Sequence, residues 1–175
     1  QFELLYNPEF MGALSDEHKL GVLMHEFYHI IFEHVTGRKP SDGLKRIDNI
    51  AMDLAINGLP EMRNKLPCES DPGPMMPSGE PMKGCLPGEG PFADLPAGKS
   101  YEWYLQALKD MQEEQGEGGE GDGGGEGQSG EGSGSGQPGD GDPFGGADSF
   151  DDHDGFGEGD STTTEIAKER LKDSL

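Results

Sequence analysis

The sequence predicts an α+β fold made of two long helices, a shorter third helix and a small edge sheet. Apolar residues recur at three- and four-residue steps through the first 60 residues, as expected of amphipathic helices. Phe2–Tyr6 alternates weakly, like a strand that ends at Asn7-Pro8. That strand has no partner in the chain, so we expect one or two strands and a helix to precede Gln1.

The first long helix has readable ends. Ser15 is a natural N-cap, and Asp16 and Glu17 place negative charge in the first turn. Gly37 is the expected residue just past the helix end. The residues between these ends predict one buried apolar stripe: Leu20, Leu23, Met24, Phe27, Ile30, Ile31 and Val35.

This helix contains an H-E-x-x-H motif, His25-Glu26-Phe27-Tyr28-His29. Two histidines four residues apart lie about one helical turn apart, so both imidazoles can reach one zinc ion. Glu26 lies roughly 100° around the helix from His25, beside an open coordination position, where a general base takes a proton from water. A chance match on an exposed helix face is the alternative, but a position at the border of the apolar stripe favours a site.

Two further histidines fit the site less well. His34 follows His29 by five residues with no intervening glycine, and a continuing helix would point it about 180° from His25. We interpret it as a surface or second-site residue. His18 is on the correct face but roughly 10 Å along the axis, and we expect it to be solvated.

A second long helix is expected to begin with Ser41 or Asp42 as its cap and to end at Gly58. Its apolar side is formed by Leu44, Ile47, Ile50, Ala51 and Leu54.

Beside that apolar side runs a polar stripe, Asn49, Asp53 and Asn57. Asp53 is a candidate third ligand. It follows His29 by 24 residues in the sequence, a separation that suits an antiparallel helix that returns past the metal. A carboxylate commonly completes a His₂ zinc site. A solvated polar face is the alternative, and Asp48 is a competing ligand.

Several motifs in order resemble a family of predicted bacterial and phage metallopeptidases whose C-terminal half is a von Willebrand A-like domain. The residues that carry the resemblance are Leu5-Tyr6-Asn7-Pro8-Glu9-Phe10, Leu14-Ser15, the H-E-x-x-H pentapeptide with His34, and 49–57. The resemblance is close over residues 1–60 and looser over 99–108.

The resemblance implies a zincin-like fold in which His25 and His29 are zinc ligands, Glu26 is the base and Asp53 is the third ligand. It also implies an AAA-type ATPase or a von Willebrand A-type protein as a partner. An Asp-Asp-His element at residues 151–153 is similar to one in the same family, and His153 is therefore a further candidate, either as a ligand or as a transition-state donor.

Composition divides the chain into three segments. Residues 1–115 contain nearly all the apolar side chains and form the predicted metallopeptidase domain. Residues 116–148 are Gly-rich and acidic, without Lys or Arg, so we expect a disordered linker. Residues 149–175 contain the Asp-Asp-His element, and we expect them to include the start of a helix that is cut off at Leu175.

The charge and cysteine content limit the class of protein. A net charge of −22 argues against nucleic acid as a partner, and no apolar run is long enough to span a membrane. No signal peptide opens the chain. Cys68 and Cys85 are interpreted as free thiols of a cytoplasmic protein, with a disulfide or second metal site as the alternatives.

These observations predict a zinc-dependent peptidase that acts on a peptide or protein substrate. Ser100 is expected to cap the third helix, which begins at Tyr101 and packs its aromatic residues in the core. Two other functions stay open: a non-enzymatic, metal-stabilised adaptor, and a zinc hydrolase of a non-peptide amide. Glu26 discriminates between them, because only hydrolysis needs a carboxylate beside the ligands.

Overall fold

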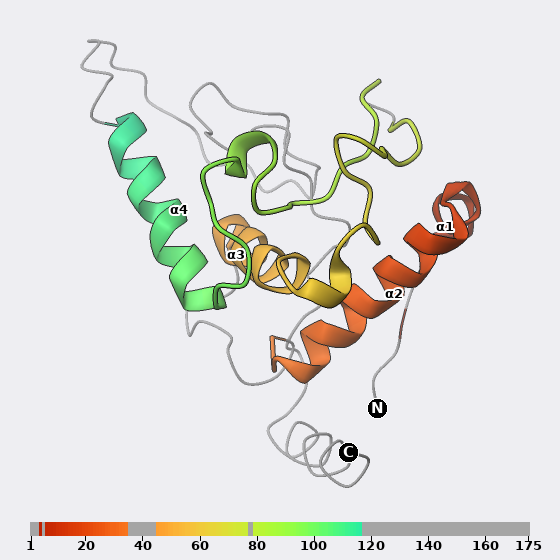
Figure 1. Ribbon diagram of the computed structural model, residues 1–175, viewed down its shortest axis with the longest axis horizontal. Coiled ribbons are helices and arrows are strands. Elements are labelled where there is room, and N and C mark those ends of the chain that lie inside the picture. Colours follow the sequence, from red (N-terminus) through yellow and green to blue (C-terminus); the bar gives the residue numbers. More distant parts are fainter. Residues whose placement is uncertain (1–3, 5, 35–44, 77–78, 117–175) are drawn as a thin grey trace, which may run out of the picture.

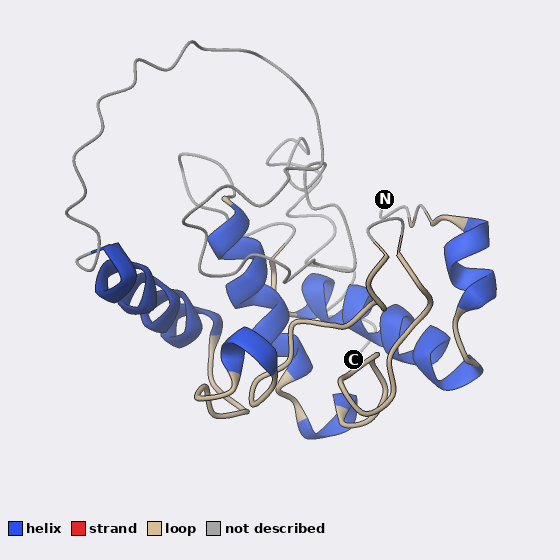
Figure 2. Cartoon of the chain, turned by 90° about the horizontal axis from the view of Figure 1, so that it is seen from above, coloured by secondary structure: helices blue, strands red, loops and turns tan. Residues whose placement is uncertain are grey.

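The computed structural model describes residues 4, 6–34, 45–76 and 79–116. Helix α3 lies between α2 and α4, and the long connection from α3 to α4 contains two short 3-10 helices (Figures 1 and 2). In chain order the elements are α1 (Pro8–Ala13), α2 (Asp16–Ile31), α3 (Arg46–Asn57), η1 (Pro60–Met62), η2 (Gly90–Phe92) and α4 (Tyr101–Gly116).

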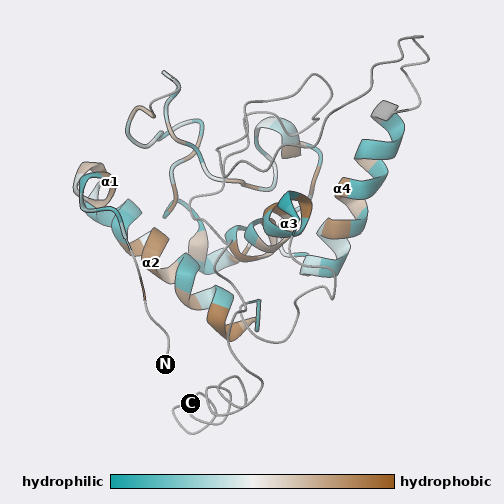
Figure 3. Ribbon diagram, turned by 180° about the vertical axis from the view of Figure 1, so that it is seen from behind, coloured by the Kyte–Doolittle hydropathy of each residue, from teal (hydrophilic) through white to brown (hydrophobic). Residues whose placement is uncertain are grey.

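Helix α3 is the centre of the core, and its residues 50–57 are all buried. One side packs against α4 and the η2 region, where Leu54, Phe92, Tyr104 and Leu108 meet. The other side contributes Ile56 to a second cluster with Val22 of α2 and with the η1 region. Both α3 and α4 carry hydrophobic and hydrophilic residues along their length (Figure 3). The most buried helix therefore separates two apolar clusters.

Helix α2 packs with a different face from the one predicted. Leu20, Leu23 and Phe27 of the predicted buried stripe are 51%, 43% and 54% exposed, so that prediction is wrong for these residues. The residues that α2 buries are His18, Gly21, Val22, His25 and His29.

Gly21 gives the physical reason for this orientation. A Cβ atom at Gly21 would lie 1.8 Å from the backbone oxygen of Lys65, so only glycine allows the chain after η1 to approach α2 this closely. The approach fixes the face that contains the histidines against the rest of the molecule.

The beginning of α2 is as predicted, but its end is not. Ser15 Oγ accepts a hydrogen bond from the His18 amide at 3.1 Å, which confirms Ser15 as the N-cap. The helix ends at Ile31, well before Gly37, because Glu33 takes a left-handed conformation with φ of 60°.

The beginning of α3 also differs from the prediction. Lys45 has an extended backbone and is the N-cap residue, so Ser41 and Asp42 do not cap this helix. The Asp48 carboxylate accepts a hydrogen bond from the Lys45 amide at 3.0 Å, which satisfies a backbone donor at the helix start. The predicted end at Gly58 is confirmed.

A short helix, α1, forms where the sequence predicted the end of a strand. Asn7 caps it, because its side-chain oxygen accepts hydrogen bonds from the Glu9 and Phe10 amides at 2.9 and 3.3 Å. Most of Phe2–Tyr6 lies outside the described residues. Within the described ranges there is no strand, only an isolated bridge between Met75 and Pro81, so the edge sheet stays a prediction.

Helix α4 begins at Tyr101 as predicted but extends to Gly116. The Ser100 hydroxyl accepts a hydrogen bond from the Trp103 amide at 3.4 Å, as expected of a cap. The predicted linker and the Asp-Asp-His element lie outside the described residues. In the part of the chain that the structure describes, no helix is long and apolar enough to cross a membrane.

Candidate metal centre

The candidate centre lies where α2 packs against α3. His25 and His29 come from the buried face of α2, one helical turn apart, and Asp53 comes from the middle of α3. All three side chains are 0% exposed. The sequence placed the two histidines at the border of a buried stripe, whereas the structure places them in the middle of the buried face.

Three donor atoms converge on one point. His25 Nε2 and His29 Nε2 are 3.0 Å apart, and Asp53 Oδ1 lies 3.5 Å from the first and 3.4 Å from the second. A tetrahedral ion with bonds of about 2.0–2.1 Å holds its ligand atoms about 3.3–3.4 Å apart. The donors therefore fit a small divalent ion. This is the one such group of His, Cys, Asp or Glu side chains among the described residues.

Glu26 is the residue that the motif predicted to be the general base, and this role stays a prediction. It follows His25 on α2 and is half-buried, in contrast to the fully buried ligands on either side of it.

Asn57 supports His25 from behind the donor set. Its Oδ1 lies 2.8 Å from His25 Nδ1, while its Nδ2 donates to the Cys85 carbonyl oxygen at 2.8 Å. The sequence showed Asn57 on the polar stripe of α3 without assigning it a role. Its spacing of four residues from Asp53 was the available signal, because such residues share one helix face.

His34 is not a surface residue. It is 0% exposed, and its Nδ1 lies 3.2 Å from His29 Nδ1. The prediction assumed that the helix continues to residue 34, but the left-handed Glu33 turns the chain back toward α2. His34 faces the nitrogen of His29 that is directed away from the donor set, so it lies beside the candidate ligands and is not one of them.

Asp48, the competing ligand, has structural partners instead. Besides capping α3, its carboxylate accepts a hydrogen bond from the Tyr101 hydroxyl at 2.9 Å. Burial raises the pKa of Tyr101, and the hydrogen bond and the charge of Asp48 raise it further. Tyr101 therefore stays a neutral donor. His153, the other alternative ligand, lies outside the described residues.

The sequence predicted a solvated His18, and this prediction is wrong. His18 is 3% exposed, and its Nε2 lies 3.3 Å from Asp71 Oδ2 at the surface. It belongs to the packing between α2 and the connection that follows η1, and it is not in the converging donor set.

The chain matches the family described as "Putative metallopeptidase domain" over residues 1–172. This match spans nearly the whole sequence. The chain belongs to this family.

The family description suggests a metal-dependent peptidase, and among the described residues the buried His25, His29 and Asp53 form a group that could bind a metal ion. No curated protein and no solved structure matches the chain.

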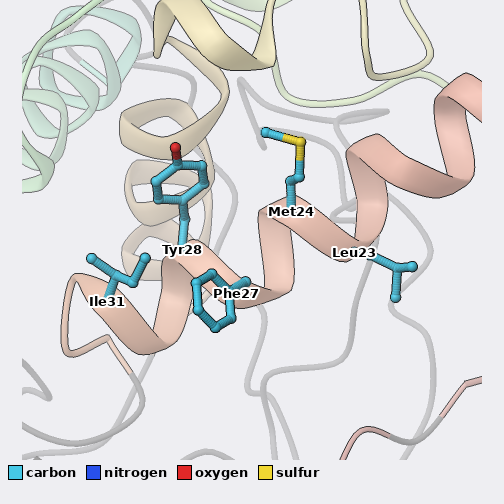
Figure 4. A pocket seen from close by; sticks show the side chains of 5 residues that line it. All are labelled: Leu23, Met24, Phe27, Tyr28 and Ile31. Atoms are coloured by element: carbon cyan, nitrogen blue, oxygen red, sulfur yellow. The ribbon is translucent and has the colours of Figure 1, made fainter. Parts of the chain in front are cut away.

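This family member also has an apolar groove on α2. It is lined by Leu23, Met24, Phe27, Tyr28 and Ile31, whose side chains Figure 4 shows along one stretch of the helix. None of the three candidate ligands lines it. The two cysteines are free, and Cys85 is buried in the core beside α3.

Proposed function

We propose that this chain is a zinc-dependent peptidase in which His25, His29 and Asp53 bind Zn²⁺ and Glu26 is the general base. The observation that carries the proposal is the convergence of three fully buried donor atoms within 3.0–3.5 Å of one another. Burying two imidazoles and a carboxylate together is costly unless something compensates their charge and hydrogen-bonding capacity, and a metal ion does so.

The choice of zinc is supported by the chemistry of the donors. Two imidazole nitrogens and one carboxylate oxygen suit a borderline divalent ion, whereas magnesium and calcium prefer oxygen ligands only. Three protein ligands also leave one coordination position open, as in catalytic zinc sites.

The proposed mechanism gives each residue one task. His25, His29 and Asp53 hold the ion, which when bound acts as a Lewis acid that polarises a carbonyl group and activates water. Glu26 takes the proton from the attacking water and delivers it to the amine that leaves. The half-buried position of Glu26, next to His25 on the same helix, supports this role.

Two observations favour a second function, a non-enzymatic module stabilised by its metal. The three donors are completely enclosed, as in structural metal sites. The hydroxyls of Tyr101 and Tyr104 also donate to Asp48 and to the Pro96 carbonyl, so they are not poised to stabilise an oxyanion. In this second function Glu26 has no chemical task.

Metal analysis and peptide cleavage of three proteins test the proposal. Wild type should contain about one zinc per chain and cleave casein or a peptide library. Glu26→Gln should keep the metal and lose cleavage by at least about 10²-fold, because the base is removed and the ligands remain. Glu17→Gln, an exposed change on the same helix, is the control and should match wild type.

Absence of bound zinc in wild type would overturn the proposed metal centre. Zinc bound at one equivalent without cleavage of peptides would favour the structural module. Glu26-dependent hydrolysis of small amides, without cleavage of peptides, would instead identify a hydrolase of a non-peptide amide.

A further inference from the structure

Each imidazole of the candidate centre is held through its second ring nitrogen by a different buried group. His25 Nδ1 contacts Asn57 Oδ1 at 2.8 Å, and His29 Nδ1 contacts His34 Nδ1 at 3.2 Å. In proteins the hydrogen bond at one imidazole nitrogen decides which nitrogen has the lone pair available for a metal. The two contacts therefore decide whether the Nε2 lone pairs of His25 and His29 are available to a metal ion.

For His25 the arrangement is determined by the amide beside it. Asn57 Nδ2 donates to the Cys85 carbonyl oxygen at 2.8 Å, so the oxygen of the amide must face His25. An amide oxygen only accepts, and the hydrogen must then be on His25 Nδ1. His25 Nε2 is left with its lone pair directed toward Asp53 and His29.

For His29 the partner is another imidazole. Between two facing Nδ1 atoms only one hydrogen is shared, so one ring donates and the other accepts. His29 Nε2 lies in the converging donor set and needs its lone pair there, which places the hydrogen on His29 Nδ1. His34 Nδ1 is then the acceptor, and His34 carries its own hydrogen on Nε2.

The end of α2 is built in a way that brings His34 to this place. The His34 amide donates to the His29 carbonyl oxygen at 3.0 Å and the Glu33 amide donates to the Ile30 carbonyl oxygen at 3.1 Å. These are the two hydrogen bonds of a Schellman motif. The residue in the left-handed position is Glu33 with φ of 60°, where glycine is usual because other residues are strained.

The His34 ring is fixed by its surroundings as well as by the backbone. It is fully buried, with its centroid 5.8 Å from that of Phe32 and 5.9 Å from that of Tyr101. Tyr101 is held in turn by its hydrogen bond to Asp48. An imidazole held this firmly against His29 Nδ1 has little freedom to turn away.

We propose that His34 is a positioning residue of the metal centre: it accepts the hydrogen bond of His29 Nδ1 and thereby keeps the lone pair of His29 Nε2 directed at the metal. Asn57, fixed by the Cys85 carbonyl, does the same for His25. The proposal rests on the metal centre proposed above and extends it to the residues that surround the ligands. Loss of such a partner typically weakens metal binding about 10–100-fold.

Affinity measurements on three variants test the proposal. His34→Phe keeps an aromatic ring of similar size but removes the acceptor, so the dissociation constant for Zn²⁺ or Co²⁺, measured by competition with a chelator, should rise about 10–100-fold. His34→Gln restores an acceptor oxygen and should recover part of the affinity. His18→Gln is the control, since His18 is another buried histidine of α2 outside the donor set, and its affinity should equal that of wild type.

Nitrogen-15 NMR of the histidine side chains in the wild-type, Zn²⁺-loaded protein provides an independent measurement that does not depend on the variants folding. It should show the hydrogen on Nδ1 of His25 and His29 and on Nε2 of His34. Co²⁺ absorption bands should shift in His34→Phe and return toward wild type in His34→Gln.

Wild-type affinity in His34→Phe, or a His34 nitrogen bound directly to the metal, would overturn this proposal while leaving the metal centre itself in place. Failure of wild type to bind either ion would overturn the metal centre instead. The two failures are therefore distinguishable in the same set of measurements.

Discussion

Two carboxylates on α3, five residues apart, have different partners and should respond differently to substitution. Asp53 Oδ1 lies 3.5 and 3.4 Å from the Nε2 atoms of His25 and His29, whereas Asp48 joins the start of α3 to Tyr101. Asp53→Ala should abolish stoichiometric metal binding, because two imidazoles alone are a weak site. Asp48→Ala should keep the metal but lower the free energy of unfolding by about 1–3 kcal/mol, since the buried Tyr101 hydroxyl loses its acceptor.

Metal analysis and urea unfolding of the two purified variants measure these effects separately. If Asp48→Ala lost the metal and Asp53→Ala retained it, the assignment of the third ligand would be reversed.

The Tyr101 hydroxyl predicts a loss of stability at alkaline pH. Burial raises its pKa above that of an unfolded tyrosine, so the folded state favours the protonated form. The resulting stability is fully present below the unfolded pKa of about 10 and is lost as pH rises from there toward the folded pKa. Tyr104, whose pKa burial also raises, adds to the same loss.

Urea unfolding of wild type and Tyr101→Phe at pH 7 and at pH 10.5–11 measures this effect. We expect the variant to be less stable at pH 7 and to lose less stability than wild type on the alkaline side. Equal slopes of stability against pH for the two proteins would contradict the prediction.

At the scale of elements, the packing of α2 depends on one glycine. A Cβ atom at Gly21 would lie 1.8 Å from the Lys65 backbone oxygen, so either α2 or the chain after η1 would have to shift. Gly21→Ala should therefore destabilise the protein by several kcal/mol, on the order of a severe steric change in a core. Gly12→Ala in α1 is the matched control, because no atom lies within 4 Å of its Cβ position.

Gly12→Ala should be neutral or stabilising by up to about 1 kcal/mol, because alanine favours a helix more than glycine does. Thermal melting of the two variants, each compared with wild type, measures the difference. If the Gly21→Ala protein had the same melting temperature as wild type, the close approach to Lys65 would not hold α2 in place.

The ends of the helices show how far the sequence alone could predict the structure. Ser15 was recognisable, because a hydroxyl followed by acidic residues in the first turn is a strong local signal for an N-cap. Glu33 could not be recognised as the residue that ends α2, because the left-handed position of a Schellman motif is usually glycine and the nearest glycine is Gly37. The sequence therefore placed His34 on a continuing helix, although the helix ends before this residue.

The features of the candidate site that depend on residue spacing within a helix were predictable, whereas those that depend on how the helices pack were not. The spacing of His25 and His29 fixes their shared face, and the distance to Asp53 suits a returning helix. The burial of that face could not be read from apolar periodicity, because α2 turns its polar ligands inward and leaves Leu20 and Phe27 exposed. A polar site in a helix interface reverses the usual relation between hydropathy and burial.

At the scale of the whole molecule, the two apolar clusters lie on different sides of α3 and are unequal. The cluster between α3 and α4 includes several large, fully buried side chains, whereas α2 meets α3 through a smaller apolar cluster and the polar donor set. A metal ion would therefore connect α2 to the rest of the core at a place where apolar packing is limited. Its removal should loosen α2 more than α4.

Metal removal should consequently lower the melting temperature of the whole protein. An ion at a free concentration about 1,000 times its dissociation constant stabilises the folded state by about 4 kcal/mol, which for a domain of this size corresponds to on the order of 10–20 °C. Melting curves of the zinc-loaded protein before and after treatment with a chelator measure this shift. Asp53→Ala is the control, because a variant without the third ligand should melt at the same temperature with or without the chelator. The hydrogen exchange of α2 amides should speed up on metal removal, while that of α4 amides changes less. A melting temperature that stays constant after the zinc has demonstrably been removed would mean that the ion does not hold α2 and α3 together.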